Sequence, residues 1–167
     1  MTPKEQNAFL SKWHAEAIRY MNNAKETLKK AGKEDDGWYK DEKYVKSACG
    51  IAHLGVLVAL DAWLTLKEVP VPKKKQRKSI GYYTDNIAKL DNKLLTTLQG
   101  EYEIVHLSGY YDGLRRIKVI EDGFCLAYSI IDKIKPENPV DVPETRGDRI
   151  RMALNKMMIS LAVTLGF

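Results

Sequence analysis

The histidines are the first residues whose chemistry could build a site. The chain has three of them, His14, His53 and His106. Each falls in a different segment of helical periodicity, and a helical bundle can gather such residues around a metal ion. Di-metal bundles, however, use inward glutamates and Glu-x-x-His pairs. The acids near these histidines lack that spacing, so we predict no metal ligands and no cofactor. The alternative is neutral, hydrogen-bonded core histidines.

Asp61 interrupts the most apolar segment of the chain, residues 47–60. A buried carboxylate is costly unless it is paired. Arg19, a histidine or a tyrosine hydroxyl on a neighbouring helix could be its partner. Asp61 is therefore either a carboxylate that anchors a ligand or a structural anchor at the edge of its helix. We favour the structural role and keep Asp61 as a candidate ligand-binding residue.

Residues 106–116 hold the densest mixture of polar and aromatic side chains. Such a mixture could bind a phosphate or stack a base. It could equally be a corner between two helices, with Gly109 and Gly113 at the turn and an ion pair between Arg116 and Asp112. We favour the corner. The candidate ligand-binding residues here are His106, Tyr110, Tyr111, Asp112, Arg115 and Arg116.

The strongest charge cluster is the run from residue 73 to residue 78, with five positive charges in six residues. The candidate nucleic-acid contacts are Lys73, Lys74, Lys75, Arg77 and Lys78. Contacts to phosphates would give salt-dependent binding, but a solvated loop is the interpretation we favour. The sequence contains no glycine-rich phosphate loop, HExxH or serine-nucleophile motif. We therefore predict no catalytic residues and do not expect an enzyme.

Helical periodicity runs through almost the whole chain. A first helix is expected over about residues 3–31, because Thr2 can cap it, Glu5 can complete a capping box and Gly32 can end it. A second is expected over about residues 41–68, with Asp41 as its cap. Its small residues recur at helical spacing and predict close packing against another helix. They are Ala48, Ala52, Gly55, Ala59 and Ala62.

The second half of the chain predicts three further elements. Residues 80–113 form one bent helix or two, since Asp91 could cap a second segment and Gly100 could mark a kink. Residues 117–134 form an apolar stripe that Pro136 ends. A proline-rich connection over residues 136–143 precedes a last helix that ends near Leu165. The predicted fold is all-α, a single domain over residues 1–167, arranged as an antiparallel bundle of about five long helices.

Composition agrees with an ordinary globular domain. The chain has 167 residues, 44% hydrophobic and 29% charged, with a formal net charge of +5. This excludes a disordered chain and falls short of a dedicated nucleic-acid coat. Cys49 and Cys125 lack zinc spacing and are predicted to be buried thiols of a cytoplasmic protein. The apolar segment around residue 53 is too short for a membrane span.

The last eleven residues, 157–167, carry no charge. A helix that is apolar on both faces needs a second partner or burial within its own chain. We predict a homodimer formed through this C-terminal helix and leave burial within the monomer as the alternative.

The order of these elements resembles the HEPN-like helical bundles of prokaryotes. The resemblance is carried by the long first helix, the small-residue segment YVKSACGIAHLGVLVALDAWL (residues 44–64), the basic loop over residues 70–79 and two more long helices. Residues 19–133, about two-thirds of the chain, look like an uncharacterised Bacteroidetes family of unknown function. The resemblance implies a helical bundle that tends to form dimers.

HEPN nucleases use an arginine followed four to six residues later by a histidine. No arginine of this chain has a histidine at that distance. The leading hypothesis is therefore a non-enzymatic, cytoplasmic module that binds a protein partner or a small ligand. The alternative is a HEPN-like component that binds or processes RNA.

Overall fold

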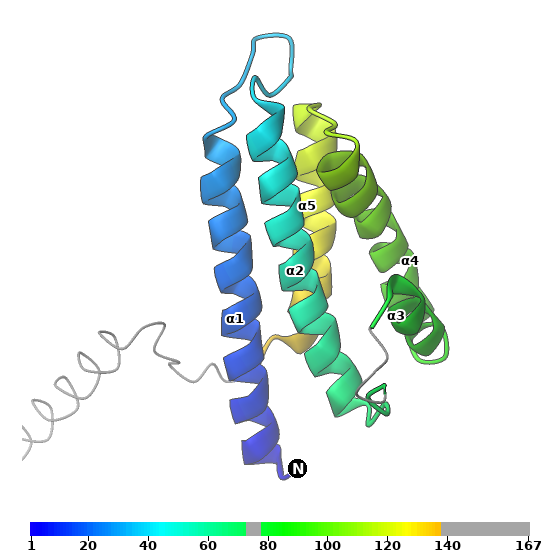
Figure 1. Cartoon of the computed structure of the whole chain (residues 1–167). Helices are drawn as coiled ribbons and strands as arrows, with labels where there is room; N and C mark the ends of the chain where they lie inside the picture. The colour runs from blue at the N-terminus through cyan, green and yellow to red at the C-terminus, as the bar shows by residue number, and fades with distance from the viewer. Residues whose placement is uncertain (73–77, 138–167) are drawn as a thin grey trace, which may run out of the picture.

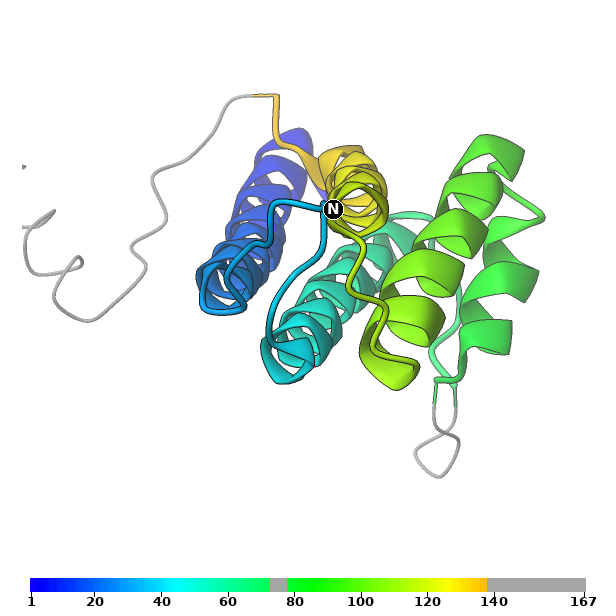
Figure 2. The same ribbon diagram turned by 90° about the horizontal axis from the view of Figure 1, so that it is seen from above.

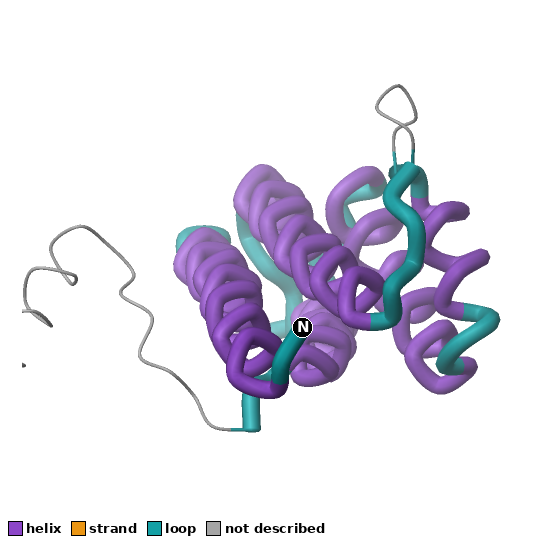
Figure 3. Tube along the Cα trace, turned by 90° about the horizontal axis from the view of Figure 1, so that it is seen from below, coloured by secondary structure: helices purple, strands orange, loops and turns teal. Residues whose placement is uncertain are grey.

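The described part of the chain is built from helices packed around a central one. The computed structural model describes residues 1–72 and 78–137, and within them the secondary structure is helical, with two isolated β-bridges and no strand (Figure 3). In order, the helices are α1 (Pro3–Lys29), α2 (Glu42–Leu66), α3 (Ile80–Ile87), α4 (Asn92–Glu101), the π-helix η1 (Tyr102–Tyr111), α5 (Ile117–Ile131) and the 3₁₀ turn η2 (Asp132–Ile134). The all-α prediction is confirmed.

The first helix begins and ends where local sequence signals place it. The Thr2 hydroxyl accepts a hydrogen bond from the backbone N–H of Glu5, and the Glu5 carboxylate accepts one from the N–H of Thr2. This is the expected capping box. After the helix ends at Lys29, Gly32 adopts a φ of +64°, which an L side chain rarely tolerates.

The central helix α2 lies beside α1 and also packs against α5 and η1 (Figure 1). Its predicted ridge of small residues is buried throughout. At Gly55 a Cβ atom would lie 2.9 Å from the Tyr20 Cβ and 3.2 Å from the Ala17 carbonyl oxygen. The two helices therefore approach closely because this position carries no side chain.

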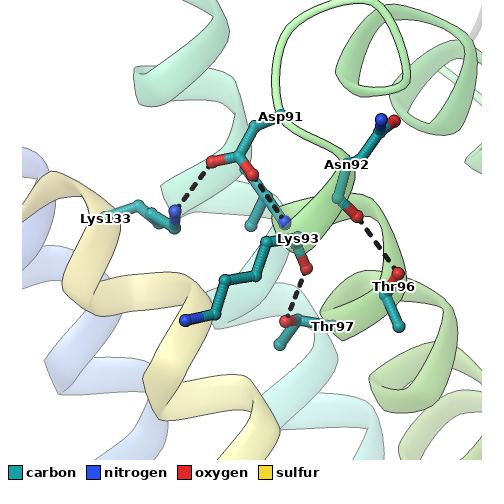
Figure 4. A network of polar contacts seen from close by, with 7 residues as sticks. Asp91, Asn92, Lys93, Thr96, Thr97 and Lys133 are labelled. Carbon is teal, nitrogen blue, oxygen red and sulfur yellow. Dashed lines mark hydrogen bonds and ion pairs between the residues drawn. The ribbon is translucent and has the colours of Figure 1, made fainter.

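Residues 80–113 divide at Asp91, as the second of the two predicted alternatives has it, and the part after Asp91 consists of α4 and η1. The short helices α3 and α4 lie on the side of the bundle away from α1 (Figure 2). The break between them is at Asp91, whose carboxylate caps α4 by accepting from the Leu94 N–H at 2.8 Å. The other carboxylate oxygen forms a 2.7 Å ion pair with Lys133, which ties the start of α4 to the turn η2 after α5 (Figure 4).

The predicted kink at Gly100 is replaced by a change of helix type. From Tyr102 to Tyr111 the backbone forms the π-helix η1, in which hydrogen bonds close a wider turn, as in the bond from the Asp112 N–H to the Leu107 carbonyl. Such segments are rare and frequently occur at functional sites.

The helix α5 carries the predicted apolar stripe into the core. Ile120, Phe124, Ala127 and Ile131 are buried, and the chain continues into η2 before Pro136. The last predicted helix, the C-terminal segment 157–167 and most of the connection over 136–143 lie outside the described residues. The sequence predicts five long helices. In the described part α1, α2 and α5 are long, and the element predicted over residues 80–113 is divided into α3, α4 and η1.

Two further sequence expectations concern burial. Among the described residues, α2 alone has the length and composition that could cross a membrane, and 56% of its most apolar window is buried inside the bundle. The expectation of two buried thiols is wrong for one of them. Cys49 is buried, but Cys125 is exposed because it lies on the outer face of α5, and both are free.

Candidate functional site

The aromatic side chains of η1 form one wall of a cavity of about 570 Å³ between η1, α2 and the start of α3. We call this cavity the ring pocket. Its η1 wall consists of Tyr102, His106, Tyr110 and Tyr111, and its α2 wall includes Gly50, Ile51, Leu54 and Leu57. Cavities of this size with mostly apolar walls and a few polar groups are typical of small-ligand sites.

The rings of η1 stack along one face of the helix. The His106 ring lies 4.8 Å from the Tyr102 ring and 5.7 Å from the Tyr110 ring, both in stacked orientation. Tyr111 meets His106 edge-on at 5.1 Å. Positions 102, 106 and 110 share a face because residues four apart are neighbours on a helix surface. In the wider turns of the π-helix, Tyr111 lies beside them and also lines the pocket.

Gly50 lets this ring stack approach α2. A Cβ atom at position 50 would lie 3.1 Å from the Tyr110 ring. Gly109, on the next turn of η1, packs directly against Cys49, whose Cβ would lie 3.1 Å from a Cβ at position 109. Gly109 is therefore a packing residue and not the turn residue expected. Gly113 alone makes the turn, with a φ of +71°.

A buried acid–base pair lies at the base of the pocket. His53 Nδ1 is 3.2 Å from both carboxylate oxygens of Glu101, and Glu101 is fully buried. An ionised carboxylate in this position accepts the Nδ1–H and leaves Nε2 as the acceptor of the ring. The pair joins the middle of α2 to the end of α4.

His106 lies directly above this pair. Its ring centroid is 4.3 Å from that of His53, and its buried Nδ1 has no hydrogen-bond partner among the described residues. Burial first, and then electrostatic repulsion between the two neighbouring imidazoles when they are protonated, lowers the pKa of His106 below its ordinary value. A buried polar atom without a partner is costly. Nδ1 itself is shielded from solvent, so His106 lines the pocket with other atoms of its ring.

The mouth of the pocket carries a cation held by Asp61. Lys78, which lines the pocket, forms a 2.8 Å ion pair with Asp61, and the Tyr83 hydroxyl donates to the same carboxylate at 2.9 Å. Burial, and then the charge of Asp61, raises the pKa of Tyr83. A tyrosine was one of the partners expected for Asp61, whereas Arg19 pairs with Glu16. Asp61 does not line the pocket itself but holds two residues that do.

The candidate residues of the corner separate into two groups. His106, Tyr110 and Tyr111 line the ring pocket, but Asp112, Arg115 and Arg116 do not. Arg115 donates to the carbonyls of Tyr39 and Lys40, and the Arg116 guanidinium lies over the Trp38 ring at 5.2 Å. The chain turns away from the pocket at Gly113. Both arginines therefore contact the loop between α1 and α2 and hold it in place.

The remaining candidates are not brought to this site. His14 is on α1, where burial lowers its pKa, and its Nε2 atom has no hydrogen-bond partner within residues 1–72 and 78–137. Lys73, Lys74, Lys75 and Arg77 lie outside the described residues. In the part of the chain that is described, no group of three or more histidine, cysteine or acidic side chains could hold a metal ion.

Glu101 is the residue that sequence reasoning missed. Glu101 is fully buried, whereas the adjacent Tyr102 is half-buried. A signal was present, since position 101 follows the buried Leu94 by seven residues, the spacing of one helix face. A glutamate at that position indicates a buried partner.

Comparisons with known proteins give a family without a known activity. Residues 12–136 match the family model described as "Domain of unknown function (DUF5618)". A solved structure of a protein of unknown function from Dyadobacter fermentans is similar, with 44% sequence identity and a TM-score of 0.66 over 74% of this chain and 94% of that one. No curated protein matches.

Proposed function

The chain belongs to this family of unknown function, and we propose that it is a binding module whose ring pocket takes a small planar heteroaromatic ligand. The observation that carries the proposal is the continuous face of stacked rings on η1, opposite an aliphatic wall on α2. A slot with these two walls favours a flat ligand, because aromatic faces gain stacking energy and aliphatic walls exclude water.

The polar groups of the pocket give the ligand its expected chemistry. The exposed Tyr110 and Tyr111 line the pocket and carry hydroxyl groups that can hydrogen-bond a polar edge of the ligand. The Lys78 ammonium at the mouth favours a negative group at the other end, although it is already paired with Asp61. A heteroaromatic acid or a nucleotide has both features.

The arrangement supports binding better than nucleophilic catalysis. The Ser47 hydroxyl donates to the Lys43 carbonyl, and burial raises the pKa of the Cys49 thiol to about 12. The two nucleophile-bearing side chains near His53 are therefore not activated by it.

Saturation-transfer NMR with a panel of nucleosides, nucleotides and aromatic acids tests the proposal. Leu54 is 49% exposed and lines the pocket, so Leu54→Trp should fill the slot without disturbing the core. Leu90→Trp is the matched control, because Leu90 is equally exposed but does not line the pocket. We expect signals from planar compounds that Leu54→Trp abolishes and Leu90→Trp keeps. Equal signals in both variants would contradict the proposal.

A second candidate function is the binding of single-stranded RNA. It is favoured by one observation, that Lys78 of the basic run lines the same pocket as Tyr110 and Tyr111. Bases stack on such rings, and lysines contact phosphates. Binding of a short RNA should then fall steeply with salt and weaken in Tyr111→Ala. Binding that is independent of salt, or unchanged in this variant, would remove this candidate.

The HEPN-like relationship, the dimer and the cytoplasmic location belong to the same proposal. The antiparallel pair of α1 and α2, followed by further helices, supports a HEPN-like bundle. The dimer rests on the uncharged segment 157–167. Light scattering of the full chain over a range of concentrations tests it, and a monomer at every concentration would contradict it.

A further inference from the structure

A second cavity of about 580 Å³ lies between the C-terminal half of α1, the loop that follows it and α5. It shares no lining residue with the ring pocket. It is formed by one face of α1 and the outer part of α5. The proposal made for the ring pocket does not involve it.

The floor of this cavity is apolar. Leu28 is 8% exposed, Phe124 5% and Tyr39 2%, and the half-buried Tyr128 completes the surface. These side chains form a slot of aliphatic and aromatic carbon that is open to solvent on one side. An apolar chain that entered it would remove this surface from water.

The rim of the cavity is cationic. Lys25 and Lys29 lie one turn apart on α1 and Lys33 lies in the loop that follows. All three line the cavity, whereas Glu121 is the one acidic residue among its lining residues. The ion pairs that Lys29 and Lys33 form are exposed to solvent. Lys29 pairs with Glu26 at 2.6 Å and Lys33 with Glu121 at 2.9 Å, and each of these four side chains is at least 50% exposed.

The remaining lysine has no carboxylate partner among the ion pairs of the described residues. The Lys25 ammonium lies 4.5 Å from the centre of the Tyr128 ring. The exposed ion pairs of Lys29 with Glu26 and of Lys33 with Glu121 contribute little to the stability of the fold. A ligand carboxylate can therefore reach the rim without breaking a strong interaction.

From the apolar floor and the cationic rim, we infer that this cavity binds an amphipathic carboxylate, an unbranched acyl chain with a negative head group. The acyl chain lies on Leu28, Phe124 and Tyr128, and the carboxylate meets Lys25 and Lys29. The charge of the rim excludes a cationic head group. The volume falls in the range of small-ligand sites.

Cys125 gives a direct readout, because it is an exposed free thiol that lines the cavity. The experiment measures alkylation of Cys125 by iodoacetamide, which is uncharged, by mass spectrometry of the full chain. Cys49 is fully buried and serves as the internal reference. Decanoate should slow the alkylation of Cys125, and octanoate should require roughly tenfold higher concentration, since two methylenes fewer are buried.

The variants separate recognition of the head group from simple partition into an apolar slot. Lys25→Gln with Lys29→Gln should weaken protection by decanoate about tenfold. The charge-matched control is Lys4→Gln with Lys93→Gln, two exposed lysines away from the cavity. In this control variant, decanoate should protect Cys125 from alkylation as well as it does in the wild type. Decanol has the same chain without the charge and should protect poorly.

Two results would overturn the inference. Equal protection by decanol and decanoate would show that the lysines do not recognise the head group. No protection by decanoate up to its solubility limit would show that the cavity does not take an acyl chain. Leu54→Trp should leave the protection unchanged, so this result and a failure of the ring-pocket proposal can be told apart.

Discussion

His53 and Glu101 are 48 residues apart in the chain, yet the Nδ1 atom of His53 lies 3.2 Å from each carboxylate oxygen of Glu101. The pair crosses the interface between α2 and the end of α4, where η1 begins. Both side chains are buried. The interaction that fixes the base of the ring pocket is therefore also one that joins two parts of the core.

We expect the loss of either partner to destabilise the fold strongly. His53→Ala leaves the Glu101 carboxylate buried without a partner, which should lower the free energy of unfolding by about 3–5 kcal/mol. Glu101→Gln keeps an oxygen that can accept from Nδ1–H and should cost less, about 1–3 kcal/mol. Urea unfolding followed by circular dichroism measures both. The double variant His53→Leu with Glu101→Leu should recover much of the loss, and strictly additive losses would refute the pairing.

Stability should fall with acidity through the range in which histidine titrates. Burial lowers the pKa of His106 and of His14 in the folded state, so the unfolded chain binds protons more readily than the folded one. The two histidines contribute their full stabilisation above the pKa of histidine in the unfolded chain, about 6.5. This stabilisation is lost as the pH falls from there through their lower pKa values in the folded state. Thermal unfolding between about pH 7.5 and pH 5 measures this loss. His106→Phe should reduce the slope, and an unchanged slope in both His106→Phe and His14→Phe would contradict the prediction.

Asp91 should stabilise the fold through two separate interactions, a helix cap and an ion pair. Its hydrogen bond to Lys133, and then that from the Leu94 N–H, holds the pKa of this carboxyl below its ordinary value. Asp91→Asn keeps a capping oxygen and removes the ion pair, so it should cost about 1 kcal/mol or less. Asp91→Ala removes both and should cost about 1–2 kcal/mol. Chemical denaturation ranks the two variants, and Lys133→Gln should match Asp91→Asn. The reverse order would show that the cap contributes nothing.

Gly109 should not tolerate a side chain. A Cβ at this position would lie 2.5 Å from the Sγ of Cys49, 3.1 Å from its Cβ and 3.2 Å from the Ile104 carbonyl oxygen. Gly109→Ala should therefore destabilise the fold by about 1–3 kcal/mol, because η1 must move away from α2. Gly37→Ala is a useful contrast, since nothing lies within 4 Å of its Cβ and its cost comes only from its φ of +86°. Cys49→Ala should partly restore Gly109→Ala, and no restoration would locate the strain elsewhere.

The sequence by itself determined the local features of this protein. The capping box at Thr2 and Glu5, the cap at Asp41, the stop at Gly32 and the apolar stripe of α5 depend on residues within about one turn of each other. Such signals are visible in the order of residues because the interacting groups are neighbours along the chain. The all-α class follows from them.

Tertiary structure alone decided the site. The sequence marked His106, Tyr110 and Tyr111, but whether their rings shared a face depended on the backbone becoming a π-helix after Glu101. It also marked Arg115 and Arg116, which the turn at Gly113 directs to the other side. Glu101 acquired its partner only when α2 packed against η1. Contacts between distant residues depend on how helices pack, and that is set by the sum of many weak interactions rather than by any local pattern.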